Sequence, residues 1–172
     1  NEFLDTKVDI VDDNVLEIDE IKGKIEFRNL DFKYPDGDEV ILDNVSFTIN
    51  AGEMVGIIGK TGCGKTTIVD LLLRTYNVKE NSIFIDDNDI MKIPFKKVRD
   101  AIGYVPQDNF LFSDTISNNI AFAFEEIDNE SIIDAAIYAD VHNNIIEFNE
   151  KYETVLGERG VTLSGGQKQR VS

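Results

Sequence analysis

One stretch of eight residues constrains this chain more than any other. Residues 59–66 read Gly-Lys-Thr-Gly-Cys-Gly-Lys-Thr, which fits the pattern G-x-x-x-x-G-K-[ST]. The glycines of such a loop let successive N–H groups turn inward, where they hold phosphates together with the N-terminus of the following helix. Lys65 then reaches the β- and γ-phosphates, and the Thr66 hydroxyl ligates Mg²⁺. The stretch predicts a nucleotide-phosphate site.

The sequence around the loop supplies the elements that this pattern requires. Met54–Ile58 is a short apolar run, which predicts a strand buried on both faces, and Thr66–Tyr76 has the spacing of a helix. We therefore assign ATP binding to the whole loop: Gly59, Lys60, Thr61, Gly62, Cys63, Gly64, Lys65, Thr66 and, on the α-phosphate side, Thr67. At Cys63 any small residue would fit; the alternative is a thiol activated by the helix N-terminus and Lys65.

Charge and composition exclude several classes of function. The 172 residues are enough for one ordinary domain, with 17 Lys and Arg against 33 Asp and Glu, a formal net charge of −16. Such acidity argues against a nucleic-acid partner, which needs clustered basic side chains, and against a polybasic membrane anchor. One cysteine allows no internal disulfide. No apolar run approaches the roughly 18 residues of a membrane helix.

The first part of the chain differs from the rest. Residues 1–22 are rich in Asp and Glu with sparse apolar positions, which predicts an acidic linker, extended or poorly ordered. An edge strand over Val8–Val11 is the alternative. From Lys24 apolar residues alternate with polar ones, and the phase changes near Asn29, which indicates a β-bulge. Pro35-Asp36-Gly37 then predicts a turn.

The remaining pattern divides the chain into three parts. Alternation over Val45–Ile49 continues the antiparallel sheet, Ile83 and Ile85 mark another strand, and Ala101–Val105 predicts a further buried strand. Helical spacing begins at Asn129, which we expect to cap a helix, and a shorter helix is expected around Asn144–Phe148. The predicted fold class is α/β: an antiparallel β subdomain at about 23–55, a P-loop NTPase core at about 54–105 and an α-helical subdomain at about 106–172.

A second motif stands about a hundred residues after the first. Leu163-Ser164-Gly165-Gly166-Gln167 is followed by Lys168-Gln169-Arg170, and here the chain resembles the ABC transporter ATPases, whose signature motif is Leu-Ser-Gly-Gly-Gln. Ser164 is also a favourable helix N-cap, after which Gly165 and Gly166 expose backbone N–H groups. The resemblance implies that Ser164, Gly165, Gly166 and Gln167 face the ATP held by a second nucleotide-binding domain, in a head-to-tail dimer.

Other stretches carry the resemblance from about Lys24 to Ser172. Tyr34, in Phe-Lys-Tyr-Pro, resembles the aromatic residue that stacks on adenine, and Gln107, in Val-Pro-Gln-Asp, resembles the glutamine that contacts Mg²⁺ and the attacking water. On this reading the catalytic residues are Lys65 and Gln107, and the metal contacts are Thr66 and Gln107. Phe110–Ile120 and Gly157–Gly160 look like the exporter subclass, with Glu158 near the intracellular loops of the membrane domain.

The chain also departs from the family pattern. Lys79-Glu80-Asn81-Ser82 replaces a common Pro-x-x-Gly turn, and Asp86-Asp87 replaces Asp-Gly; we expect only altered turns. The sequence stops at Ser172, inside the signature helix, so the fold is expected to be incomplete at its C-terminus. The strand with the Mg²⁺-linked aspartate, the catalytic glutamate and the switch histidine are not in these residues. His142 precedes the signature and is expected to be a packing or surface residue.

The resemblance implies an ATPase that binds Mg-ATP and, in the full protein, powers export across a membrane. Its expected partners are a second nucleotide-binding domain and a transmembrane domain, and its expected place is the cytoplasmic face of the membrane. Residues 1–22 would link it to that membrane domain, and residues 1–172 alone should turn over little ATP. The alternatives are an ABC-type ATPase of DNA repair or translation, and a nucleotide-binding regulatory module. A calcium loop at Asp86–Asp89 is rejected, because Ile90 occupies a ligand position.

Overall fold

The computed structural model describes residues 10–12, 14–107, 109–124, 128–157 and 163–172. The chain divides into two compact units, Asn1–Gly103 and Tyr104–Ser172, which are described separately below. The phosphate loop belongs to the first unit and the signature motif to the second. No helix in the described ranges has the length and apolar character needed to cross a membrane.

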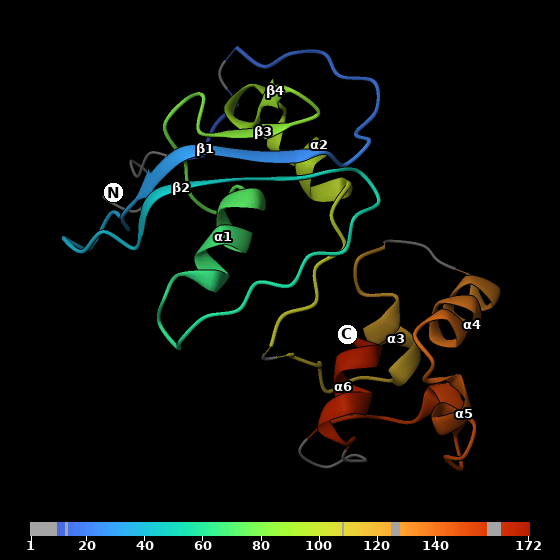
Figure 1. Ribbon diagram of the computed structural model, residues 1–172. Helices are drawn as coiled ribbons and strands as arrows, with labels where there is room; N and C mark the ends of the chain where they lie inside the picture. The colour runs from blue at the N-terminus through green and yellow to red at the C-terminus, as the bar shows by residue number, and fades with distance from the viewer. Residues whose placement is uncertain (1–9, 13, 108, 125–127, 158–162) are drawn as a thin grey trace, which may run out of the picture. The chain divides into compact units, whose positions relative to one another are not determined.

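The first unit is built on a four-stranded sheet (Figure 1). Its strands are β1 (Ile25–Phe32), β2 (Leu42–Ile49), β3 (Ile83–Ile85) and β4 (Asn88–Asp89), in the order β2-β1-β3-β4. Every pairing between them is antiparallel. The period-2 alternation therefore predicted β1 and β2 correctly, whereas β3 is buried at all three positions and β4 was not predicted.

The predicted bulge near Asn29 is confirmed. Phe27 pairs with Phe47, but the next partners are Leu30 and Val45, so β1 gains one residue between the two pairs. Asn29 takes up the irregularity with φ 43°, a left-handed conformation that asparagine tolerates better than most residues. The bulge returns Leu30 to the buried face, where it is fully covered.

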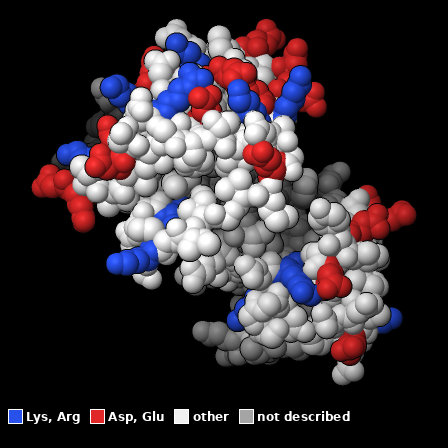
Figure 2. Space-filling view, viewed as in Figure 1, with Lys and Arg blue, Asp and Glu red and all other residues white. Residues whose placement is uncertain are grey.

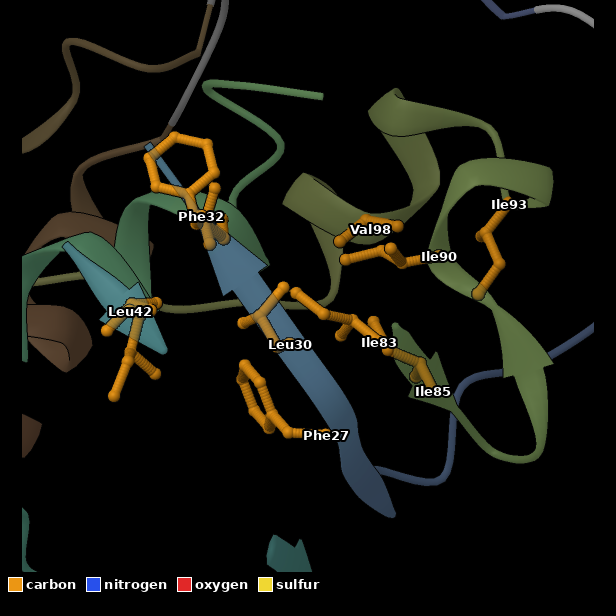
Figure 3. Close-up of a cluster of buried hydrophobic side chains, with 11 residues drawn as sticks. Phe27, Leu30, Phe32, Leu42, Ile83, Ile85, Ile90, Ile93 and Val98 are labelled. Atoms are coloured by element: carbon orange, nitrogen blue, oxygen red, sulfur yellow. The ribbon is translucent and has the colours of Figure 1, made fainter. Parts of the chain in front are cut away.

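Helices cover the sheet and enclose an apolar core. They are α1 (Lys65–Leu72), the 3₁₀ turn η1 (Ile90–Lys92) and α2 (Phe95–Asp100). Figure 3 shows side chains from β1, β3, η1 and α2 that take part in this core, among them Leu30, Ile83, Ile90 and Val98. The buried members of this core are Phe27, Leu30, Phe32, Leu42, Ile68, Leu71, Ile83, Ile85, Ile90, Ile93 and Val98.

Two predicted strands are absent from the structure. Met54–Ile58 has no regular secondary structure, and Met54 and Ile58 are 100% and 97% exposed. Ala101–Val105 is likewise irregular, with Val105 61% exposed. A strand buried on both faces needs a neighbour on each edge, and no strand among the described residues pairs with either segment. The predicted helix Thr66–Tyr76 is also shorter, since α1 ends at Leu72.

The described part of the acidic N-terminal segment packs against the rest of the first unit. Residues 10–12 and 14–22 contain no helix or strand, so the edge strand is not seen at Ile10 and Val11, while Val8 and Asp9 lie outside the described residues. Leu16 N donates to Lys92 O at 2.7 Å, and Lys97 Nζ donates to Asp19 O at 2.8 Å. In Figure 1 this dark blue segment passes around β4 and α2.

The second unit is helical. It contains α3 (Ile116–Ile120), α4 (Asn129–Tyr138), α5 (His142–Ile145), the 3₁₀ turn η2 (Lys151–Glu153) and α6 (Gly165–Val171). Asp128 caps α4, one residue before the predicted cap at Asn129, because its side chain accepts from Ser131 N. The helix expected at Asn144–Phe148 is α5, which begins and ends earlier. The buried members of the apolar cluster of this unit are Ile116, Ala136, Val141, Ile145, Leu156, Leu163 and Val171.

Candidate nucleotide-binding site

The phosphate loop winds around the ammonium group of Lys65. This residue opens α1, and its Nζ donates to the carbonyl oxygens of Gly59 at 3.0 Å and Lys60 at 2.7 Å. Cys63 Sγ lies 3.8 Å from the same nitrogen. The loop itself, residues 59–63, is exposed to solvent. One positive charge is therefore fixed at the centre of an accessible backbone loop, without an acidic partner among the contacts described for it.

Gly64 joins the loop to α1 in a conformation that requires glycine. Its φ is 86°, which L side chains rarely adopt. A Cβ atom here would also lie 2.8 Å from Leu42 Cδ2 and 3.2 Å from the Ile41 carbonyl oxygen. The loop therefore approaches the start of β2 closely, and this contact sets the direction in which α1 leaves the loop.

The N-terminus of α1 lacks a side-chain cap. Its N-cap residue, Gly64, makes no side-chain hydrogen bond, and the first turn contains no acidic residue. The first N–H groups of a helix have no intrahelical acceptor, and the helix dipole adds partial positive charge there. Together with Lys65, these groups form a site for an anion with several oxygen atoms, such as a phosphate chain.

Tyr34 lies beside this helix. Its hydroxyl is 2.8 Å from the Thr67 hydroxyl, which is in the first turn of α1 and only 4% exposed as a residue. Thr66, the predicted Mg²⁺ ligand, is exposed in the same turn. The structure thus brings the predicted base contact, Tyr34, next to the predicted phosphate contacts of α1, although these residues are separated by about thirty positions in the chain.

The signature motif forms the start of α6, as predicted for Ser164. The Ser164 side chain accepts from Gln167 N at 3.3 Å, and Gln167 Oε1 accepts from Ser164 N at 2.9 Å, so the two residues form a capping box. Ser164, Gly165 and Gly166 are exposed. A Cβ atom on either glycine would meet nothing within 4 Å. This helix terminus is consequently open to an approaching ligand or protein.

The remaining predicted site residues lie in the second unit. Gln107 is exposed and has no regular secondary structure. Of the exporter-like stretch at 157–160, residues Glu158, Arg159 and Gly160 lie outside the described residues. His142 has the packing role that its position indicated: it is half-buried, and its Nδ1 lies 2.8 Å from the Tyr152 hydroxyl. Burial raises the pKa of Tyr152 above its ordinary value.

Two buried polar residues were not identified from the sequence. Arg74 is 1% exposed and donates to Asp12 and to the Ile93 carbonyl. Asn119, in α3, accepts from Phe112 N at 2.7 Å and donates to Phe112 O at 3.2 Å, so it holds the segment before α3 as a neighbouring strand would. The only sequence signals were an arginine shortly after the apolar end of α1 and the second of two adjacent asparagines in α3.

The first unit carries charges of both signs on its surface. In Figure 2 basic and acidic side chains are mixed over the visible face of the first unit, and no broad basic patch appears there. The basic residues are in several cases paired, as Arg28 is with Glu26 and Lys24 is with Asp87. A phosphate site in this chain therefore depends on local groups: the loop backbone, Lys65 and the start of α1.

A glycine-rich loop wound around a lysine, leading into an uncapped helix beside a sheet, defines a P-loop nucleotide-binding protein of the α/β class. The model of the family described as "ABC transporter" matches residues 42–172. The chain belongs to this family, and its domain is of the ATPase type.

Individual relatives agree with this assignment. The chain is 43% identical over 171 residues to the uncharacterized ABC transporter ATP-binding protein YfiB of Bacillus subtilis, covering 99% of this chain and 30% of that protein. It is 44% identical to an ATP-dependent lipid A-core flippase of Syntrophus aciditrophicus, covering 99% of this chain and 28% of the flippase. The chain thus spans less than a third of the length of these relatives.

A solved structure gives the same result for the fold. A bacterial Atm1-family ABC exporter with ATP bound matches with a TM-score of 0.88 and 39% identity, covering 99% of this chain and 30% of that chain. At this identity the likeness extends to sequence as well as fold. The family expectation drawn from the two motifs is therefore confirmed, and the roles of individual site residues remain predictions.

Proposed function

We propose that this chain is the nucleotide-binding part of an exporter-type ABC transporter, which binds Mg-ATP at Gly59–Thr67 and uses its hydrolysis to drive export across a membrane. The observation that carries the proposal is the position of Lys65 Nζ, held by the carbonyls of Gly59 and Lys60 at the open N-terminus of α1. The named relatives support the transport part, since one is a flippase and another an exporter.

The phosphate chain would be held by the loop backbone and by Lys65, which has three donor protons and can exchange loop carbonyls for phosphate oxygens. Mg²⁺ neutralises phosphate charge when bound. No group of three His, Cys, Asp or Glu side chains that could hold a metal occurs among the described residues. Thr66 offers one exposed hydroxyl, which fits Mg²⁺ that is bound mainly through phosphate and water oxygens. Gln107, in the second unit, would offer one amide oxygen as a further contact.

The first unit holds the candidate contact to the adenine base, and the second unit holds the candidate contacts to the ATP of a second nucleotide-binding domain. Tyr34, next to Thr67, would stack on adenine. Ser164, Gly165, Gly166 and Gln167 would contact the ATP of a second nucleotide-binding domain, in a head-to-tail dimer. The exposed start of α6 supports this role, because a Cβ atom on Gly165 or Gly166 would meet none of the described residues within 4 Å. Gln107 would place the attacking water, as part of a site that the dimer completes.

A membrane domain is the proposed partner of an aromatic surface on the second unit. Phe110, Phe112 and Phe122 are 74%, 41% and 67% exposed, and their rings contact each other with centroids 5.0 and 4.3 Å apart. A group of exposed aromatic side chains is costly in water unless another protein surface covers it. The proposed location is accordingly the cytoplasmic face of a membrane, with the segment before Lys24 leading to the membrane domain.

The proposal is tested by titrating Mg-ATP calorimetrically into the chain, into Lys65→Ala and into Lys79→Ala. Lys79 is an exposed lysine outside the loop, so its loss changes the net charge equally. We expect binding by the wild type and by Lys79→Ala, and at least about a hundredfold weaker binding by Lys65→Ala, since a charge-assisted phosphate contact is lost. Equal affinities in all three would contradict the phosphate site.

A further inference from the structure

Three aromatic rings pack against one another at Tyr34, the residue proposed to contact the nucleotide base. Tyr34 follows β1, and its ring meets Phe32 edge-on at 5.2 Å between centroids. Tyr76, which follows α1, also meets Tyr34 edge-on, at 5.1 Å with an interplanar angle of 76°. Phe32 and Tyr76 are 5.9 Å apart, so each ring contacts the other two. Phe32 is buried, whereas Tyr34 and Tyr76 are half-buried.

These contacts leave the Tyr34 ring little freedom. An aromatic side chain at the end of a strand can ordinarily rotate about its two side-chain torsions, which moves the ring over several ångströms. Here the edge-on contacts fix the plane of the ring, because such pairs have preferred geometries. The hydrogen bond of 2.8 Å to Thr67 fixes its far end. The ring is thereby connected at once to the sheet and to α1.

From this arrangement we propose that Tyr76 and the Thr67 hydroxyl are positioning residues, which hold Tyr34 as a preformed platform for the nucleotide base. The inference rests on the proposed function, and it adds that base recognition depends on a residue, Tyr76, which no motif of the sequence marks. Preorganisation raises affinity because the ordering of the ring is already complete before the ligand arrives. This gain in affinity applies to ligands that have a base and is absent for a bare phosphate chain.

The direction of the hydrogen bond follows from the chemistry of the ligand. Phosphate oxygens at neutral pH accept hydrogen bonds, so a Thr67 hydroxyl that contacts a phosphate must donate to it. The Thr67 oxygen then accepts from the Tyr34 O–H. This chain of two hydrogen bonds connects the base platform to the residue that would contact the phosphates.

The test compares two ligands, Mg-ATP and inorganic triphosphate, by calorimetric titration of the chain. Tyr76→Leu removes the ring, and Tyr76→Phe retains it as the matched control. We expect Tyr76→Leu to weaken ATP binding about three- to tenfold, the range of one edge-on aromatic contact, and to leave triphosphate binding within about twofold. Tyr76→Phe should bind both ligands as the wild type does. Tyr34→Phe, a milder change, should weaken ATP binding by about two- to fivefold through loss of its hydrogen bond.

Each other outcome has a distinct meaning. If Tyr76→Leu weakens the binding of ATP and of triphosphate equally, or changes neither, Tyr76 does not position the base platform and the inference is overturned. If Tyr76→Leu does not fold, by circular dichroism, an unchanged ATP affinity in Tyr34→Phe overturns the inference instead. A wild type that binds ATP no more tightly than triphosphate would refute the base contact of Tyr34 itself. A wild type that binds neither would refute the proposed phosphate site, and the inference would fall with it.

Discussion

The buried guanidinium group of Arg74 forms an ion pair with Asp12, at 3.1 Å between Nη1 and Oδ1. The Arg74 side chain is 1% exposed and that of Asp12 25%. The same Arg74 nitrogen donates to the Ile93 carbonyl at 2.8 Å, and the Asp12 carboxylate accepts from Phe95 N at 3.0 Å. The pair therefore fastens the acidic N-terminal segment to the core at the point where α1 has just ended.

Removing Asp12 should destabilise the first unit measurably. Asp12→Ala leaves the buried Arg74 charge without its acidic partner and Phe95 N without this acceptor. We expect a loss of about 2–3 kcal/mol in the free energy of unfolding, below the full cost for a wholly buried pair because water reaches Asp12. Urea unfolding followed by circular dichroism measures it.

Asp100→Ala is the control for this prediction. Asp100 pairs with Lys96 at 2.7 Å, and both side chains are largely exposed. Loss of such a surface pair should change stability by less than about 1 kcal/mol. Equal effects of Asp12→Ala and Asp100→Ala would mean that the Arg74 contact contributes no more than a surface ion pair.

Gly64→Ala should disrupt the phosphate loop without abolishing the fold. The new Cβ would have to occupy a left-handed conformation and would lie 2.8 Å from Leu42 Cδ2. We expect a loss of roughly 1–3 kcal/mol of stability, as for other strained backbone positions, and a loss of ATP binding. Gly56→Ala is the control, since its Cβ would meet nothing within 4 Å. A wild-type ATP affinity of Gly64→Ala in calorimetry would contradict the close approach of the loop at Gly64 to Leu42.

Local patterns in the sequence predicted those parts of the structure that local interactions determine. The loop at Gly59–Thr66, the bulge at Asn29 and the cap at Ser164 each depend on residues within a few positions of one another or on one phase change. The predicted strands at Met54–Ile58 and Ala101–Val105 failed for a different reason. An apolar run indicates burial in some context, but a strand exists only where a partner strand lies beside it.

Contacts between distant parts of the chain could not be predicted. Asp12 and Arg74 are separated by 62 positions, and Tyr34 and Thr67 by 33. Neither pair follows a periodicity, and each arises only when the sheet brings α1 near both the strand ends and the N-terminal segment. The sequence therefore predicted a set of phosphate contacts, and the structure adds contacts between distant parts of the chain, such as Tyr34 with Thr67 and Asp12 with Arg74.

Variants of Ser164 should separate helix stability from ATP contact. Ser164→Ala removes the capping box and should cost about 1 kcal/mol of stability in the second unit. Ser164→Asp retains a capping oxygen but adds negative charge at the start of α6. If this terminus faces ATP held by a second copy or a related domain, Ser164→Asp should abolish ATP-dependent dimerisation in sedimentation experiments with the full-length protein. Unimpaired dimerisation of Ser164→Asp would contradict the proposed contact.

Acid should loosen the anchorage of the N-terminal segment through Asp86. Burial alone would raise the pKa of Asp86, but the backbone N–H groups of Lys24, Lys22 and Gly23 bind its carboxylate and hold the pKa below its ordinary value. A lowered pKa contributes stability that is present above the unfolded pKa of about 3.9 and is lost as pH falls through the folded pKa.

The measurement is the urea midpoint of the wild type and of Asp86→Asn between pH 6 and pH 3. We expect Asp86→Asn to be less stable at pH 6, and the difference to shrink as the solution becomes more acidic, since the wild type then loses the same interaction. A difference between the two proteins that stays constant over this range would contradict the role of the ionised carboxylate.

Bound nucleotide should protect Cys63 from alkylation. It is the one cysteine of the chain, it is exposed, and its Sγ lies 3.8 Å from Lys65 Nζ inside the loop that would surround the phosphates. A maleimide adduct at this sulfur would fill the loop, so labelling and Mg-ATP binding should exclude each other. We expect saturating Mg-ATP to slow labelling at least about tenfold, as followed by mass spectrometry. A tenfold excess of occupied over free sites requires only a modest binding energy. Adenosine, which has no phosphates, should give no protection, and ATP should give none in Lys65→Ala. Equal labelling rates with and without ATP in the wild type would place the nucleotide outside this loop.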